Sequence, residues 1–124
     1  MNSKIINIAI LLVIFSAVLV HSANLNAYPF DLTQTKTATW SDGTNNVFST
    51  FDCHLINLSG NTVTLTSITA NSAPVSVWGA LSPSETTTFA VQEWASSISP
   101  NGTVSFGYLV QSSNAISWTY SSSA

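Results

Sequence analysis

The sequence predicts an all-β protein, an antiparallel β-sandwich of about seven to eight strands. Short runs rich in Val, Ile, Thr and aromatic residues alternate with clusters of Gly, Pro, Asn and Ser, and this spacing is typical of sandwiches. No segment shows the 3.6-residue periodicity of an amphipathic helix. The expected strands cover residues 33–40, 46–57, 62–69, 74–78, 86–91, 103–110 and 115–120.

A secretory signal peptide is expected over residues 1–22, followed by cleavage. Lys4 supplies the positive start, a largely apolar run follows over residues 5–20, and Ser22 and Ala27 each end an acceptable cleavage sequence. A membrane anchor is the alternative, but the uninterrupted apolar stretch is shorter than the roughly 20 residues that span a bilayer, and no basic cluster follows it. The sequence therefore predicts a secreted, extracellular protein with no membrane contact after cleavage.

The segment after the leader is expected to form one domain, residues 28–121. A chain of roughly 100 residues can bury about two-thirds of its unfolded surface, enough for one core. The whole chain carries a net charge of −3, and Lys36 is the one lysine or arginine after the leader. Nucleic acids and anionic membranes are therefore poor partners. A surface of Ser, Thr and Asn suits a neutral ligand that is rich in hydroxyl groups.

The single cysteine, Cys53, rules out an intramolecular disulfide. Phe51 and Leu55 share its alternation phase, so we expect Cys53 to be a small buried apolar residue in a monomer. The alternative is a dimer linked through Cys53, since the leader predicts an oxidising compartment.

Alternation along the last two strands separates a core face from a polar face. Successive residues of a strand point to opposite sides of the sheet. The apolar residues of these strands fall in one phase each: Val104, Phe106, Tyr108 and Val110, then Ile116, Trp118 and Tyr120. Trp118 is therefore expected inside the sandwich.

Two large rings of the first strands fall on polar phases. Trp40 shares its phase with Gln34 and Lys36, and Phe48 shares its phase with His54. The alternation rule that buries Trp118 therefore presents these rings to solvent.

Two further tryptophans are also expected outside the core. Trp78 shares its phase with Ser76, and Trp94 follows a strand, beside Glu93. Packing over the rim of the sandwich is the alternative for any one of these rings. Several rings on exposed phases instead indicate an interaction surface.

The order of short motifs resembles a known family. The matching landmarks are Gln34, Thr39-Trp40, Gly43, Phe48, Asn57-Leu58-Ser59, Trp78-Gly79, Trp94, Pro100-Asn101-Gly102 and Phe106-Gly107-Tyr108. This series is similar to carbohydrate-binding module family 49, the cellulose-binding domain at the C-terminus of plant family 9 endoglucanases and in small secreted stand-alone proteins. The resemblance implies a non-catalytic β-sandwich that binds cellulose or a related β-glucan. Carried onto this chain, its binding rings are Trp40, Phe48, Trp78 and Trp94.

The chemistry of such a ligand also suggests polar contacts. Aromatic rings can lie against the C–H faces of sugars, and amide or carboxylate groups can bond the edge hydroxyls. Gln34 and Glu93 are the candidates for these bonds, whereas Asp42 before Gly43 fits a turn. No metal or cofactor is expected, because His54 has no partner at ligand spacing.

Two sequons predict a glycoprotein, with candidate glycans at Asn57 and Asn101. We expect no enzyme, because no serine or cysteine lies in a recognisable nucleophile motif. Two alternatives stay open. One is a structural or adhesion protein of an extracellular coat whose rings bind a protein partner. The other is a small glycosidase using paired carboxylates.

Overall fold

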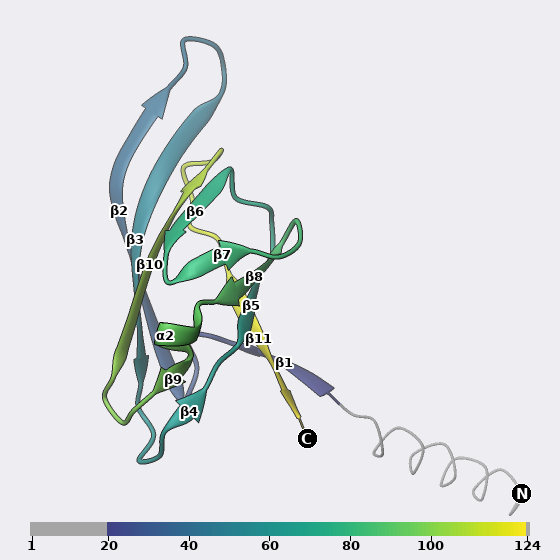
Figure 1. Cartoon of the computed structure of the whole chain (residues 1–124). Coiled ribbons are helices and arrows are strands. Elements are labelled where there is room, and N and C mark those ends of the chain that lie inside the picture. The colour runs from purple at the N-terminus through teal and green to yellow at the C-terminus, as the bar shows by residue number, and fades with distance from the viewer. Residues whose placement is uncertain (1–19, 124) are drawn as a thin grey trace, which may run out of the picture.

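The computed structural model describes residues 20–123, and these form a β-sandwich, which confirms the predicted fold class (Figure 1). Within residues 20–123 the helix is α2 (Glu93–Ser96), a single turn that the sequence did not predict. The strands are β1 (Val20–Asn24), β2 (Phe30–Ser41), β3 (Val47–Asn57), β4 (Val63–Thr64), β5 (Ser67–Ala70), β6 (Ser76–Gly79), β7 (Leu81–Pro83), β8 (Thr88–Val91), β9 (Ser97–Ile98), β10 (Thr103–Val110) and β11 (Trp118–Ser123). This number exceeds the expected seven to eight because three short strands were not predicted and the segment 62–69 divides into β4 and β5.

Two antiparallel sheets form the layers of the sandwich. One has five strands in the order β1-β11-β5-β8-β7, and the other has four in the order β2-β3-β10-β6. A small β4-β9 pair lies beside them. The chain changes sheets between β6 and β7 at Gly79, where φ is +84° and an added Cβ would lie 2.9 Å from the Ser105 carbonyl oxygen. Only glycine suits this crossing without strain.

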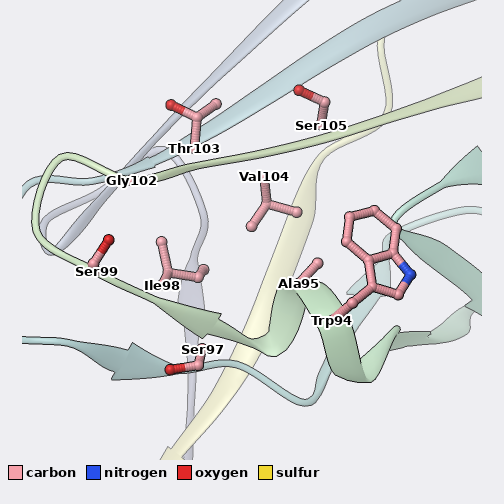
Figure 2. A pocket seen from close by; sticks show the side chains of 9 residues that line it. All are labelled: Trp94, Ala95, Ser97, Ile98, Ser99, Gly102, Thr103, Val104 and Ser105. Atoms are coloured by element: carbon pink, nitrogen blue, oxygen red, sulfur yellow. The ribbon is translucent and has the colours of Figure 1, made fainter.

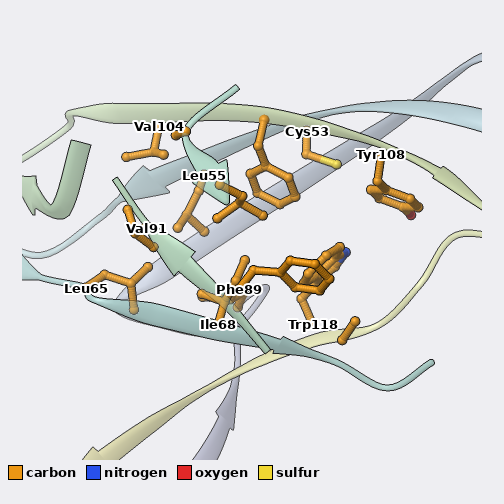
Figure 3. Packing of buried hydrophobic residues seen from close by; sticks show 14 of the residues in the cluster. Cys53, Leu55, Leu65, Ile68, Phe89, Val91, Val104, Tyr108 and Trp118 are labelled. Carbon is orange, nitrogen blue, oxygen red and sulfur yellow. The ribbon is translucent and has the colours of Figure 1, made fainter. Parts of the chain in front are cut away.

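Trp118 lies at the centre of the core, as the alternation predicted. Its side chain is 2% exposed. Its ring meets those of Phe89, Phe106 and Tyr108 edge-on, at centroid distances of 5.3–5.7 Å. Figure 3 shows Phe89 and Tyr108 beside it. Rings from both sheets therefore meet on this one indole.

A β-bulge at Thr37 changes the facing of strand β2. The register pairs Lys36 with Phe51 but Trp40 with Phe48, because the pairing shifts between Lys36 and Ala38. The extra residue returns Trp40 to the outer face, while Gln34 and Lys36 share the inner phase. The prediction that Trp40 shares a face with Gln34 and Lys36 is therefore wrong, although Trp40 does point outward.

Gln34 takes part in a hydrogen-bond network inside the sandwich. Its Oε1 accepts from the Tyr108 hydroxyl at 2.6 Å and from the Cys53 thiol at 3.8 Å. Its Nε2 donates to the Ile116 carbonyl at 2.9 Å, and the Ile116 amide donates to the Tyr108 oxygen at 2.8 Å. The Gln34 amide is thus engaged at both ends, and its pairing with Cys53 places it on the inner face of the sheet, away from the outward rings.

Cys53 is fully buried, as its neighbours predicted. A thiol without solvent contact cannot reach a second chain, so the folded protein does not support the alternative of a Cys53-linked dimer. Burial, and then the charge of Asp52, raise the pKa of the thiol from 9.0 to about 12. Burial likewise raises the pKa of Tyr108 from 10.0 to about 12.

The raised pKa values of Cys53 and Tyr108 predict that the folded protein loses stability at alkaline pH. Above about pH 9 the unfolded chain releases protons that the folded chain keeps, so stability is complete below this pH and falls as the pH rises toward about 12. Urea unfolding between about pH 8 and about pH 11 should show a falling midpoint. Cys53→Ala should make the fall less steep, and a constant midpoint in the wild type would contradict this assignment.

The N-terminal edge of the five-stranded sheet begins before the expected domain boundary at residue 28. Strand β1 pairs along β11, and the amide of Leu25 donates to the Trp118 carbonyl at 3.1 Å. The Leu25 side chain is 0% exposed, so it belongs to the core. The predicted signal peptide, residues 1–22, lies almost wholly outside the described residues.

The burial of Leu25 predicts different stabilities for the chains that the two candidate cleavages would produce. A chain that begins at Ala23 keeps Leu25, whereas a chain that begins at Tyr28 lacks it. Losing a buried leucine costs about 2–5 kcal/mol, so the shorter chain should unfold at a clearly lower urea concentration. Equal midpoints for chains 23–124 and 28–124 would show that Leu25 contributes little.

Candidate functional site

The outer face of the four-stranded sheet gathers three of the four predicted rings. Trp40 and Phe48 stand opposite each other on β2 and β3, and Trp78 stands on the edge strand β6. Around them the outer phase carries the polar side chains Thr33, Thr35, Thr50, Asp52, His54, Ser76 and Ser105, together with the apolar Ala38, Ile56 and Leu109. We call this surface the ring face.

Trp40 and Phe48 form one aromatic platform. Their ring centroids lie 6.1 Å apart and their planes differ by 21°. Trp40 is 44% exposed and Phe48 is partly buried beneath the same surface. The pair lies near the tip of the β2–β3 hairpin, which projects beyond the rest of the sandwich (Figure 1).

The turn of this hairpin is held by Asp42, in agreement with its predicted turn role. Its carboxylate accepts from the Thr44 hydroxyl, from the Thr44 amide at 2.9 Å and from Asn46 Nδ2 at 3.1 Å. The bonds from Thr44 and then Asn46 lower the pKa of Asp42. Gln111 Nε2 donates to Asn46 Oδ1 at 3.0 Å, so the turn is tied to the segment after β10. These bonds steady the strand ends that carry the platform.

Trp78 lies across the backbone of β10. Its register partner is Gly107, and a Cβ added there would lie 2.2 Å from the indole Nε1. Gly107 therefore leaves the space that the ring occupies, and one side of the indole covers the strand. Trp78 is 42% exposed, so the other side faces solvent.

Polar groups that the sequence analysis did not select lie beside Trp78. A shallow hollow of about 230 Å³ is bordered by Trp78, Asp52, His54 and Ser105, among others. His54 Nδ1 and the Ser105 hydroxyl are hydrogen-bonded at 2.9 Å. Asp52 and His54 share the alternation phase of Phe48, and this signal could have identified them.

Trp94 does not lie on the ring face. It belongs to α2 and is 73% exposed. Its Nε1 donates to Gln92 Oε1 at 3.1 Å, and Gln92 Nε2 donates to the Gly79 carbonyl at 2.8 Å. The ring forms one wall of a separate hollow (Figure 2). Glu93 is exposed in the same turn of helix.

The two sequons have different surroundings. Asn57 is fully buried, and its Nδ2 donates to the carbonyls of Asn61 and Ile98 at 2.8 and 2.9 Å. A glycan on that nitrogen is incompatible with this packing, so the prediction for Asn57 does not fit the folded protein. Asn101 is exposed, in a turn with φ of +62°.

The acidic residues do not form an enclosed centre. All five carboxylates of the chain are exposed: Asp31, Asp42, Asp52, Glu85 and Glu93.

Within residues 20–123 no three His, Cys, Asp or Glu side chains are grouped so that they could hold a metal ion. No helix of the described residues is long and apolar enough to cross a membrane.

Comparison with known proteins decides the family. The family model for the carbohydrate-binding domain CBM49 matches residues 30–112, about two-thirds of the chain. The chain belongs to the CBM49 family. This CBM49 domain is a carbohydrate-binding module, and the matched range includes all four predicted rings. No curated protein and no solved structure matches the chain.

Proposed function

We propose that this protein is a secreted, non-catalytic cellulose-binding module that lays its ring face against cellulose or a related β-glucan. The observation that carries the proposal is the placement of Trp40, Phe48 and Trp78 on one face of one sheet. Their separation follows from sheet geometry. Phe48 and Trp78 are four residues apart along the strands and two strands apart, which corresponds to about 16 Å. A face of this length spans several sugar units of a polymer.

The chemistry of the face matches that of a β-glucan. Each flat side of the polymer exposes C–H groups, which gain apolar contact and weak electrostatic attraction against Trp40 and Trp78. The hydroxyls along its edges meet the Asp52 carboxylate, which accepts hydrogen bonds, and His54 and Ser105, which can donate or accept. Because the sheet fixes the rings, little conformational entropy is lost when they meet a rigid polymer.

The exposed setting of the acids supports a non-catalytic role. A glycosidase needs a carboxyl group with a raised pKa to protonate the leaving oxygen. Bonds from Thr44 and Asn46 lower the pKa of Asp42 instead. Family membership and the expected leader together favour a role in an extracellular coat or matrix, where the cellulose partner is found.

A retention experiment tests the proposal. The purified protein is mixed with microcrystalline cellulose, with chitin and an uncharged synthetic resin as controls. We expect retention on cellulose, and displacement by soluble β-1,4-linked gluco-oligosaccharides at high concentration. Retention on none of the polysaccharides would overturn the proposal. It would also favour the alternative, an adhesion protein whose rings bind another protein.

A further inference from the structure

We propose that the hollow beside Trp94 is a second sugar-binding subsite, which takes one pyranose unit of a single free glucan chain. This inference rests on the proposed function and assigns Trp94 a different task from the ring face. The ring face suits the flat surface of a polymer crystal, whereas this hollow suits a chain that is not packed against others.

The hollow lies where strand β6 ends. Pairing of β6 with β10 stops at Phe106 and the Ala80 amide still donates to the Ser105 carbonyl, so the β10 edge beyond it, at residues 103–104, borders α2 and β9 instead. The space has a volume of about 290 Å³. In Figure 2 the Trp94 ring stands at one end, Ser99 and Gly102 lie toward the other, and Ile98 and Val104 lie between them. A crystal surface cannot enter such a concave site, but a single chain can.

The lining has the composition that a neutral sugar needs. Trp94 offers an aromatic wall, and the nearly buried Ile98 and Val104 form the floor of the hollow. Hydroxyl groups come from Ser97 and Ser99 on the β9 side, whereas the side chains of Thr103 and Ser105 point away from the hollow in Figure 2. No charged side chain borders the space. An apolar surface with a few hydroxyls around it can bind the C–H face of a pyranose and its edge hydroxyls together.

Hydrogen bonds fix the position of the Trp94 ring, although the ring does not contribute to the core. It is the most exposed tryptophan of the chain, so its position is not explained by packing. The bonds from Trp94 to Gln92 and from Gln92 to Gly79 fix the indole against the end of β6. A ring already fixed in place loses less entropy on binding, which favours a ligand contact.

One residue of strand β10 links the hollow to the ring face. Ser105 borders both this hollow and the one beside Trp78. A chain that leaves the polymer surface near Trp78 can therefore pass Ser105 and place its next units against Trp94. Gly102 and Thr103 of the Asn101 sequon also line the hollow, so a glycan at Asn101 would compete for the same space.

The test compares two ligands on the purified protein after removal of N-linked glycans. Isothermal titration calorimetry measures binding of a soluble β-1,4-linked glucose hexamer, and sedimentation measures adsorption to microcrystalline cellulose. Trp94→Ala should weaken hexamer binding about tenfold or more, but change adsorption by no more than about twofold. Trp94→Phe should restore part of the hexamer affinity, because it returns an aromatic wall. Ser99→Ala removes one hydroxyl from the hollow and should also weaken hexamer binding.

Matched controls make each outcome decisive. Tyr28→Ala removes an exposed ring outside both surfaces and should change neither measurement, while Trp40→Ala should affect adsorption more than hexamer binding. If the wild type adsorbs to cellulose but Trp94→Ala binds the hexamer normally, the subsite is overturned and the proposed function stands. Equal losses for both ligands would place Trp94 on the ring face and overturn the separate subsite. A wild type that binds neither ligand overturns both proposals.

Discussion

Trp40→Ala and Trp78→Ala should each weaken adsorption to cellulose about tenfold, and the double variant should lose about a hundredfold. Each ring supplies exposed aromatic surface to the ring face, and losing a contact of about 1.4 kcal/mol is a tenfold change in affinity. The two rings lie more than about 10 Å apart by sheet geometry, so their effects should add. Adsorption isotherms at several protein concentrations give the required dissociation constants.

Gly107→Ala provides a matched control for the role of Trp78. The added methyl group needs the space of the indole, so the ring must move although its chemistry is unchanged. Adsorption should fall toward the level of Trp78→Ala, and the position of the ring would then be shown to matter. If Trp40→Ala and Trp78→Ala both adsorb fully to cellulose and both keep their folds by circular dichroism, the polysaccharide is bound elsewhere.

Trp118→Ala should destabilise the fold by about 3–5 kcal/mol, the usual cost of truncating a large core aromatic residue. Trp118 is almost fully buried and contacts three other rings from both sheets. A domain of this size has a total stability of about 5–15 kcal/mol. The variant should therefore unfold at a clearly lower urea concentration than the wild type. Urea unfolding followed by fluorescence of the remaining tryptophans measures the loss.

Trp118→Phe separates the volume of this side chain from its aromatic character. It keeps a ring against Phe89, Phe106 and Tyr108, so it should lose less stability than the alanine variant. Any Trp118 variant that stays folded should still adsorb to cellulose. A stable Trp118→Ala protein that no longer adsorbs would invert the assignment of the inner and outer faces.

The sequence predicts most of the layout because alternation reports which side of a strand is buried. The inward facing of Cys53, Tyr108 and Trp118 and the outward facing of Phe48 and Trp78 all agree with that rule. The rule fails at Gln34. Gln34 pairs with Cys53 on the inner face, and the bulge at Thr37 then turns Trp40 to the opposite face. Bulges have no fixed sequence signature when no glycine is present. Gln34 is therefore part of the internal network instead of the ring face.

Residues that act together from distant parts of the chain are the hardest to predict. Ser105 and His54 are far apart in sequence but hydrogen-bonded on one face. The short helix that carries Trp94 has too few residues for a periodic pattern, so only the folded chain shows that it stands beside β10. The burial of Asn57 likewise depends on contacts with Ile98, which no local motif records.

Composition, strand periodicity and motif order determined the sandwich, its aromatic core and the presence of outward rings, because each depends on neighbouring residues in the chain. Only the tertiary structure decided that Trp40, Phe48 and Trp78 share a face and that Trp94 borders a separate hollow. These placements depend on strand register, on the bulge in β2 and on where β6 ends. They are set by hydrogen bonds between strands that are distant in sequence, and no local pattern encodes them.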